Sequence, residues 1–241
     1  MSPPNSSPPD SKPLGRKPIL CYVTDRRSFL AAPQKDSLEA LLEKIQQAAA
    51  AGVDWIQLRE RDLSSKQSAS LTREALHRIS KQAGHAEGGT RILVNDRLDV
   101  ALAEQAGGVH LGENSLPVQE AKRLVAASPA VKSVPPDFLA GVSCHSLAAA
   151  QSAAIAGADY IFFGPVFATP SKAAYGAPQG LERLAELCTS VAIPVLAIGG
   201  ITLGNAPACF SAGASGIAAI RLFQDSADPA GIVGAIRPQS F

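Results

Sequence analysis

Eight short apolar runs recur along the chain from residue 18 onward. Each is followed by a polar or glycine-containing turn and then by an Ala/Leu-rich amphipathic stretch. The runs are largely continuous and do not alternate with polar residues, as is typical of parallel strands covered by helices on their outer face. They span residues 19–24, 55–59, 92–95, 108–111, 139–143, 160–163, 195–198 and 216–220, with helical stretches such as 37–51, 66–82 and 181–190 between them.

This repeated strand–helix unit predicts an α/β fold, a single (β/α)8 TIM barrel. Four of the predicted helices end in Ala-Gly before the next strand, and glycine there permits a left-handed C-cap; these pairs are at 51–52, 106–107, 156–157 and 212–213. An open doubly wound sheet is the structural alternative, but it does not explain why polar residues gather directly after the runs. We place the barrel at residues 18–241 and interpret the Pro/Ser-rich residues 1–17 as a disordered tail.

Composition restricts the class of partner. Hydrophobic residues make up 46% of the 241 residues and the net charge is +1, so a large core is expected and neither nucleic acid nor an acidic membrane is an expected partner. We expect a cytoplasmic location, because the N-terminus lacks the apolar segment of a secretory signal and no run is long enough to cross a bilayer. The four cysteines lack zinc-site spacing and are interpreted as reduced thiols. The sequence leaves the oligomeric state open, a homo-oligomer included.

Functional residues of such a barrel lie where the strands end. At the end of the second run, alternation places Gln57, Arg59 and Arg61 on one side of an extended segment. Guanidinium groups bind phosphate oxygens in a bidentate manner, so these residues predict an anion site. The simpler interpretation is a solvated run of charges.

The third run ends in Asn95 and Asp96. Asp96 is a candidate ligand for Mg²⁺, which favours one or two carboxylates together with substrate phosphate oxygens and water. The alternative is an N-cap, in which Asn95 or Asp96 begins the next helix.

The ends of the later runs supply further candidates. Ser143 ends the fifth run and His145 follows it, although a lone histidine at a strand end is more often structural. The longest loop follows the sixth run, and its polar residues Thr169, Ser171 and Lys172 suit an anion-gripping lid, the alternative being an ordinary surface loop.

A second anion site is predicted after the last two runs. The loops after strands seven and eight form the phosphate pocket of many such barrels, and paired glycines let a phosphate approach the backbone. The residues expected there are Gly199, Gly200, Ile220 and Arg221. If strand alternation continues to residue 221, Arg221 lies on the inward face. Two anion sites are what a reaction between two phosphorylated substrates requires.

The chain resembles the thiamine phosphate synthase family over nearly its whole length after residue 18. The matching motifs are YVTD at 22–25, QLRE at 57–60, VND at 94–96, GVHLG at 108–112, GPVF at 164–167 through Lys172, and IGGIT at 198–202. Their order is specific for the superfamily, which also includes the thiazole tautomerases.

The resemblance implies a transferase of thiamine biosynthesis whose substrates are hydroxymethylpyrimidine pyrophosphate and thiazole phosphate or its carboxylate. Pyrophosphate leaves, and the thiazole nitrogen captures a pyrimidine-methyl cation. The resemblance assigns the pyrimidine pyrophosphate to Gln57, Arg59, Arg61, Asn95, Ser143 and Lys172, with Arg59, Ser143 and Lys172 as catalytic residues. It assigns Mg²⁺ to Asp96 and the thiazole phosphate to Thr169, Ser171, Gly200 and Ile220.

Three positions depart from the family pattern. The family usually has Lys at Arg61, a second metal-binding Asp at Ser115 and Ser at Arg221. Glu113 is a candidate to replace the missing carboxylate. The main alternative is a thiazole tautomerase, because His145 matches its acid–base histidine, and the remaining one is a non-catalytic barrel that binds a phosphorylated ligand.

Overall fold

The computed structural model describes residues 17–29, 37–82, 89–127, 135–169 and 177–237. The predicted tail at 1–17 therefore lies, except for Lys17, outside the described residues. No helix of the described segments has the length and apolarity needed to cross a membrane.

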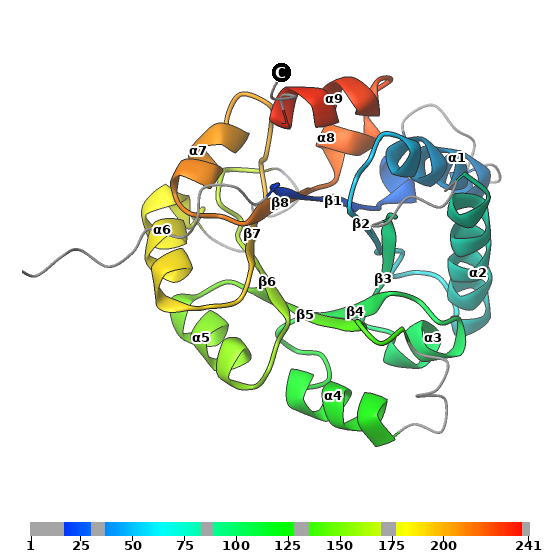
Figure 1. Cartoon of the computed structure of the whole chain (residues 1–241), viewed down its shortest axis with the longest axis horizontal. Coiled ribbons are helices and arrows are strands. Elements are labelled where there is room, and N and C mark those ends of the chain that lie inside the picture. Colours follow the sequence, from blue (N-terminus) through cyan, green and yellow to red (C-terminus); the bar gives the residue numbers. More distant parts are fainter. Residues whose placement is uncertain (1–16, 30–36, 83–88, 128–134, 170–176, 238–241) are drawn as a thin grey trace, which may run out of the picture.

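Eight parallel strands close into one barrel, in which each strand pairs with its neighbours along the chain and β8 pairs with β1 (Figure 1). This closure confirms the predicted (β/α)8 barrel and excludes the open doubly wound sheet. The strand ends differ from the predicted runs by no more than one residue. The strands are β1 (Ile19–Val23), β2 (Trp55–Leu58), β3 (Arg91–Asn95), β4 (Gly108–Leu111), β5 (Leu139–Cys144), β6 (Tyr160–Phe163), β7 (Val195–Ile198) and β8 (Gly216–Ala219).

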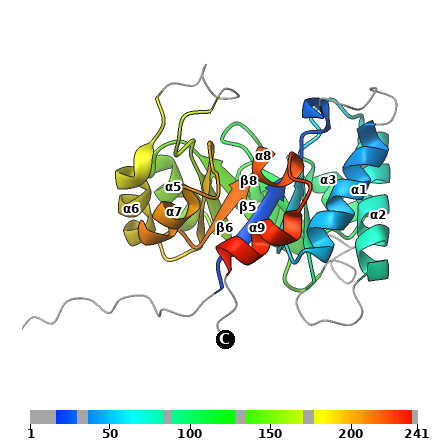
Figure 2. The same cartoon turned by 90° about the horizontal axis from the view of Figure 1, so that it is seen from above.

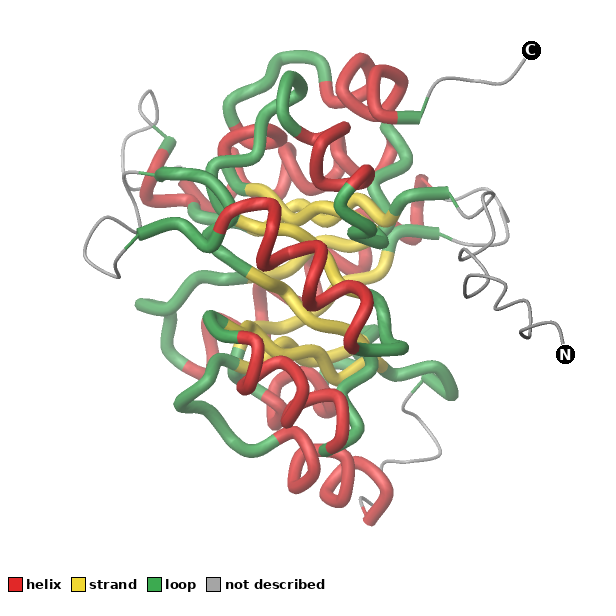
Figure 3. Tube along the Cα trace, turned by 90° about the vertical axis from the view of Figure 1, so that its left-hand side faces the viewer, coloured by secondary structure: helices red, strands yellow, loops and turns green. Residues whose placement is uncertain are grey.

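Helices surround the barrel on its outer face, as Figures 2 and 3 show from two further directions. Two short helices depart from the regular alternation: a 3-10 turn follows β1, and β8 is followed by two helices in place of one. The helical elements are η1 (Arg26–Ser28), α1 (Ser37–Ala50), α2 (Ser65–Gln82), α3 (Leu98–Ala103), α4 (Val118–Ala127), α5 (Leu147–Ile155), α6 (Gly180–Ser190), α7 (Ala206–Ser211), α8 (Arg221–Gln224) and α9 (Pro229–Ile236).

Alternation along the strands divides their side chains between two cores. Outward-facing residues such as Ile56 and Val94 pack with the helices. The inward-facing cluster fills the barrel with apolar and aromatic groups, so the interior is solid, and functional groups have room only at its ends. The inward cluster consists of Cys21, Val23, Leu93, Tyr160, Phe162, Leu196 and Ala218.

One arginine ties the last described segment to the first at the amino ends of β1 and β2. The Arg237 side chain, 7% exposed, donates from Nε to the Pro18 carbonyl at 2.9 Å and from Nη1 to the Gly52 carbonyl at 3.0 Å. Its Nη2 also pairs with Asp54, which accepts the Leu20 N–H at 2.7 Å. We call these contacts of Arg237 with Pro18, Gly52 and Asp54 the Arg237 clasp.

The predicted glycine C-caps are confirmed at three of the four positions, where Gly52, Gly157 and Gly213 have φ values of 87°, 90° and 91°. The prediction is wrong at Gly107. There the left-handed residue is Gln105, with φ of 55°, and Gly107 is needed because a Cβ would lie 2.1 Å from Arg91 Cγ. The four cysteines are buried free thiols, as predicted.

Candidate functional site

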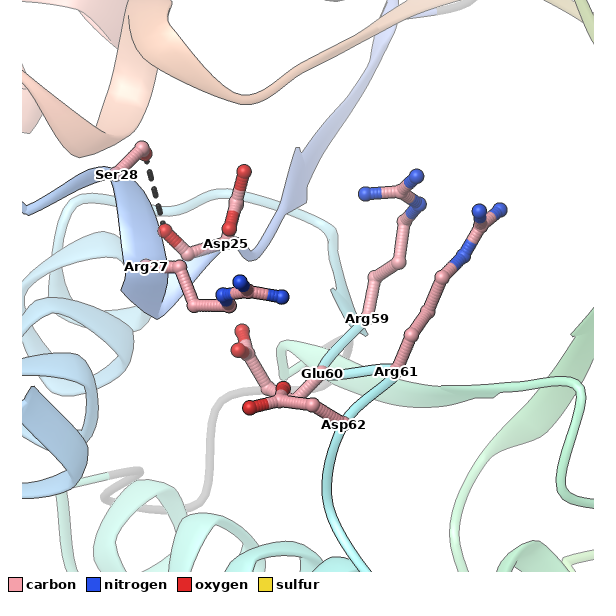
Figure 4. Close-up of a pocket in the computed structure, with 7 residues that line it drawn as sticks. All are labelled: Asp25, Arg27, Ser28, Arg59, Glu60, Arg61 and Asp62. Atoms are coloured by element: carbon pink, nitrogen blue, oxygen red, sulfur yellow. Dashed lines mark hydrogen bonds between the residues drawn. The ribbon is translucent and has the colours of Figure 1, made fainter.

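The segment after β2 separates its charges by sign, as the predicted alternation requires. Figure 4 shows Arg59 and Arg61 extended side by side, with Glu60 and Asp62 turned to the opposite side. Arg26 from η1 pairs with Glu60 at 2.9 Å and with Asp62 at 2.7 Å. The two carboxylates are therefore compensated by an arginine that follows a different strand.

Glu60 is the anchor of this arrangement, because its side chain is only 3% exposed. It accepts hydrogen bonds from Thr24 Oγ1 at 2.6 Å and from the Arg26 N–H at 3.1 Å. Thr24 Oγ1 in turn accepts the Arg59 N–H at 3.0 Å. This network fixes the backbone from which Arg59 and Arg61 project.

Within the described residues, neither Arg59 nor Arg61 forms an ion pair with a carboxylate. Burial lowers the pKa of the Arg59 guanidinium from its ordinary value, and the charge of Arg61 lowers it further. The effect of Arg61 means that the two positive charges stand close together. Nearby carboxylates offset the lowering only in part. A bound anion would relieve this repulsion, and phosphate oxygens match the guanidinium geometry.

A cavity of about 370 Å³ opens beside these arginines, a volume within the usual range of ligand pockets. It lies at the carboxyl ends of β1 and β2, where barrels of this kind place their chemistry. Its lining consists of Asp25, Arg27, Ser28, Arg59, Glu60, Arg61 and Asp62 (Figure 4).

A chain of side-chain hydrogen bonds continues from β2 to β3. Gln57, 2% exposed, donates from Nε2 to Asn95 Oδ1 at 2.8 Å, and Asn95 Nδ2 donates to Asp96 Oδ2 at 2.8 Å. The structure thus joins three residues that the sequence placed in one site.

Asp96 is not the N-cap of α3. Arg97 occupies that position without a side-chain cap, and Asp96 adopts a left-handed backbone with φ of 59°. Its carboxylate turns toward the loop after β4, where Oδ1 accepts the Gly112 N–H at 3.1 Å and the Ser115 hydroxyl. The N-cap alternative is therefore wrong, and the unusual backbone holds an exposed carboxylate at the mouth of the barrel.

The surroundings of Asp96 bear on the predicted Mg²⁺ ligand. In the described part of the chain, no group of three His, Cys, Asp or Glu side chains forms a closed metal site. Mg²⁺ does not need such a group, because it is commonly held by one or two carboxylates plus phosphate oxygens and water. At Ser115 a hydroxyl contacts Asp96, and Glu113 Oε1 accepts the His145 N–H at 2.8 Å.

His145 and Ser143 have different surroundings. The Nδ1–H of His145 donates to the Gly164 carbonyl. Ser143 Oγ lies 2.8 Å from Nε2 of His110, whose Nδ1 lies 3.0 Å from the Tyr160 hydroxyl. Burial lowers the pKa of His110 to about 3, so its imidazole is neutral.

Gly199 and Gly200 have φ values of 95° and 67°, but the structure adds a second reason for glycine. A Cβ at Gly199 would lie 2.5 Å from Pro165 Cβ, and one at Gly200 would lie 2.7 Å from the Ala168 carbonyl oxygen. The loop after β6 also donates the Phe167 N–H to the Gly199 carbonyl at 3.0 Å. The glycines therefore dock the two loops together. Of the loop's predicted residues, Thr169 is described, whereas Ser171 and Lys172 lie outside the described residues.

The prediction for Arg221 rested on strand alternation and is wrong in that respect. β8 ends at Ala219, Ile220 is the N-cap of α8, and Arg221 is the first residue of that helix. Its side chain is exposed. Arg221 thus begins a helix after the carboxyl end of β8 and does not lie on the inward face of a strand.

Several residues of the site were not identified from the sequence. Thr24, Arg26 and Glu60 carry the buried network under the arginines, and His110 with Tyr160 lies under Ser143. The strand register offered a hint for the second group, because His110, Ser143 and Tyr160 all fall on the inward face of neighbouring strands.

Comparison with known proteins agrees with this geometry. A sequence model described as thiamine monophosphate synthase matches residues 27–223. The chain is 43% identical over 189 residues to a putative thiamine-phosphate synthase of Geobacter sulfurreducens, covering 78% of this chain and 82% of the relative. It is 39% identical to the thiamine-phosphate synthase of Chlorobium phaeobacteroides, covering 91% and 95%.

Among solved structures, the chain is similar to a thiamine phosphate pyrophosphorylase from Pyrococcus furiosus, with a TM-score of 0.72 and 30% identity over 91% of this chain and 93% of that one. Matches of this extent establish common descent as well as a common fold. The chain belongs to the thiamine monophosphate synthase family.

Proposed function

We propose that this chain is a transferase of thiamine biosynthesis that joins hydroxymethylpyrimidine pyrophosphate to thiazole phosphate, or its carboxylate, and releases pyrophosphate. The observation that carries the proposal is the pair of incompletely compensated arginines, Arg59 and Arg61 (Figure 4), with the carboxylate of Asp96 close enough to act on the charge of Arg59. Cations facing a departing pyrophosphate are what this reaction needs.

In the proposed reaction, the bond between the pyrimidine methylene carbon and the pyrophosphate oxygen breaks, and its electron pair stays on pyrophosphate. The thiazole nitrogen then donates its lone pair to the methylene cation. Arg59 and Arg61 bind the pyrophosphate oxygens, while the Gln57–Asn95 hydrogen bond holds Asn95 in place. Lys172 and Ser143 remain proposed contacts of the pyrophosphate.

Asp96 is the proposed Mg²⁺ ligand, with Glu113 the candidate for a second carboxylate. Bound Mg²⁺ supplies charge neutralisation for the pyrophosphate. The thiazole phosphate is proposed to occupy the loops after β6, β7 and β8, where Thr169, Ser171, Gly199, Gly200 and Ile220 belong to the pocket and Arg221 lies at its rim.

The competing function is thiazole isomerisation. The observation in its favour is His145, whose Nδ1–H donates to the Gly164 carbonyl, because an acid–base histidine needs a ring of fixed orientation. An isomerase has no use for pyrophosphate ligands, however, and the connected side chains of Gln57, Asn95 and Asp96 support the transferase.

One assay separates these functions. The purified protein is incubated with both synthase substrates and Mg²⁺, and release of pyrophosphate and formation of thiamine phosphate are measured. Thiazole isomerisation is followed in parallel with the thiazole substrate alone. Pyrophosphate release that requires both substrates supports the proposal, whereas isomerisation without it would replace the proposal with the tautomerase. Neither activity, with ligand binding retained, would identify a binding protein.

A further inference from the structure

Three polar side chains meet inside the barrel directly below its mouth. His110 of β4, Ser143 of β5 and Tyr160 of β6 lie on adjacent strands, and the register pairs His110 with Gly141 and Gly141 with Tyr160. The imidazole bridges the other two groups, with Nε2 2.8 Å from Ser143 Oγ and Nδ1 3.0 Å from the Tyr160 hydroxyl.

Packing fixes this arrangement. A Cβ at Gly141 would lie 1.9 Å from Tyr160 Cζ, so the tyrosine ring occupies the space that any other residue at 141 would take. The Phe162 ring lies 4.2 Å from the His110 ring, centroid to centroid. His110 and Tyr160 are 1% and 0% exposed, which leaves their polar atoms no access to bulk water.

The direction of the two hydrogen bonds follows from counting protons. A neutral imidazole has one N–H and one lone pair. If Nδ1 carried the proton, the phenolic hydrogen of Tyr160 would have no acceptor among the described residues, and a buried unpaired donor is destabilising. With the proton on Nε2, Tyr160 donates to Nδ1, and Nε2–H donates to Ser143 Oγ, so each buried donor is used.

Because Ser143 Oγ accepts from His110, its own hydrogen is left to point toward the mouth. Ser143 is only partly buried, and Asn95, which lies beside Asp96, is the strand partner of His110. We propose that Tyr160 and His110 are positioning residues that make Ser143 a hydrogen-bond donor to the departing pyrophosphate. This inference rests on the proposed function, and it adds a buried chain of donors, Tyr160 to His110 to Ser143, which we call the donor relay.

The donor relay has a physical benefit for the reaction. Successive hydrogen bonds polarise one another in a low-dielectric interior, so each donation strengthens the next. A donor aimed at an oxygen that gains negative charge stabilises the transition state more than the substrate. Loss of the relay should therefore lower kcat more than it raises KM for the pyrimidine pyrophosphate.

A double-mutant cycle of Tyr160→Phe and Ser143→Ala tests the coupling. We expect Tyr160→Phe to lower kcat about tenfold in the parent, with little change in KM, and to lower it less than about twofold when Ser143 is already alanine. The same factor in both backgrounds would mean that Tyr160 acts through packing alone and would overturn the relay.

Tyr22→Phe is the matched control. Tyr22 is also 0% exposed and loses one hydrogen bond, to Gln224 Oε1 at 3.0 Å, but that bond leads away from Ser143. We expect its effect on kcat, whatever its size, to be the same with and without Ser143→Ala. If Tyr22→Phe were coupled to Ser143→Ala as strongly as Tyr160→Phe is, the cycle would report a general loss of packing order in the barrel. That result would count against the donor relay.

His110→Gln and His110→Asn provide a second test, independent of whether Tyr160→Phe folds. A Gln side chain can place its amide donor near the position of Nε2, whereas Asn reaches only the position of Nδ1. We expect the Gln variant to retain at least tenfold more turnover than the Asn variant at matched melting temperature; equal rates would overturn the donor relay. A parent protein that releases no pyrophosphate would refute the proposed function itself, a result distinct from either outcome.

Discussion

At the scale of single residues, the mouth of the barrel is organised by which charges are compensated. Arg26 pairs with both Glu60 and Asp62, which leaves Arg59 and Arg61 to attract an anion. Asp96 is held by donors from Asn95, Gly112 and Ser115. One carboxylate of fixed orientation therefore lies close enough to Arg59 to act on its charge, and a carboxylate near arginines suits a metal–pyrophosphate complex.

Asp96→Ala should lower Mg²⁺-dependent turnover by about 100-fold or more, because several kcal/mol of charge stabilisation at the pyrophosphate depend on the metal. Thiazole phosphate affinity, measured by calorimetry, should stay within about twofold of the parent's, since that ligand uses other loops. Asp99→Ala is the matched control, because Asp99 pairs with Arg97 on the surface, and it should keep full activity. Normal turnover of the Asp96 variant at ordinary Mg²⁺ would place the metal elsewhere.

Ser115→Asp should lower the Mg²⁺ concentration that gives half-maximal rate, since it adds a carboxylate where a hydroxyl now contacts Asp96. Without metal the two carboxylates repel each other, so the variant should melt at a lower temperature than the parent in EDTA and recover in Mg²⁺. Titration of the rate against Mg²⁺ and melting curves in both buffers measure these effects. An unchanged Mg²⁺ response would indicate that Glu113 or another group already supplies the second ligand.

Arg221→Ser should weaken thiazole phosphate binding at least tenfold, because a charge-assisted hydrogen bond contributes about 1.5–3 kcal/mol. Binding of the pyrimidine pyrophosphate should barely change. Arg221 begins α8 beside Ile220, so the expectation now depends on an exposed side chain after the carboxyl end of β8 and no longer on strand alternation. Equal calorimetric affinities for thiazole phosphate in variant and parent would remove Arg221 from the site.

At the scale of elements, the loops after β6 and β7 form one unit. The Val166 and Phe167 N–H groups donate to the Ile198 and Gly199 carbonyls at 2.9 and 3.0 Å, and Asn205 Nδ2 donates to the Gly200 carbonyl at 2.9 Å. Any change that separates these loops should disturb the proposed thiazole phosphate pocket as a whole.

Gly200→Ala should destabilise the protein by at least about 2 kcal/mol, from a left-handed backbone and a crowded contact together, and should weaken thiazole phosphate binding. Gly204→Ala is the matched control in the same loop, where a Cβ meets nothing closer than Thr202 Oγ1 at 3.8 Å, and it should be close to neutral. Denaturant unfolding of both variants measures the difference. Equal stability of the two variants would show that the loop after β6 moves to accommodate the added methyl group at little cost in free energy.

The elements themselves were predictable because buried parallel strands are apolar runs bounded by turns, and all eight strands were located. Short elements are harder to predict. Because α8 has four residues, too few to show a helical period, the sequence pattern wrongly extends the last strand to Arg221. The left-handed residue after α3 is Gln105. Residue preferences for left-handed backbone would instead select the nearby Gly107. Contacts between distant segments, such as Arg26 with Glu60 or His110 with Ser143, depend on packing that a sequence does not display.

At the scale of the whole molecule, the contacts that close the barrel and the candidate functional site lie at opposite ends of the strands. The Arg237 clasp joins the last helix to the starts of β1 and β2, far along the strands from the arginines of the mouth. Asp159 has a similar role between β5 and β6, accepting the Ala140 N–H at 2.8 Å and pairing with Lys122 at 2.7 Å.

Arg237→Ala should lower the free energy of unfolding by about 3 kcal/mol or more, because it leaves a partly buried carboxylate without its partner, and kcat should not change at a temperature where the variant is folded. Arg73→Ala, which breaks a pair whose arginine is 69% exposed, should cost less than about 1 kcal/mol. Urea unfolding compares them. A clasp variant as stable as the parent would mean that closure of the barrel does not depend on the chain ends.

The filled interior of the barrel also determines the route by which substrates reach the site. Tyr160, Phe162 and Leu93 are 0–1% exposed, and the missing side chain at Gly141 is what lets the tyrosine ring block the central axis. The barrel is consequently a blind pocket and not a tunnel. In the proposed reaction both substrates enter, and both products depart, through the opening at the carboxyl ends of the strands. A product that stays bound at this opening would therefore block the next pair of substrates.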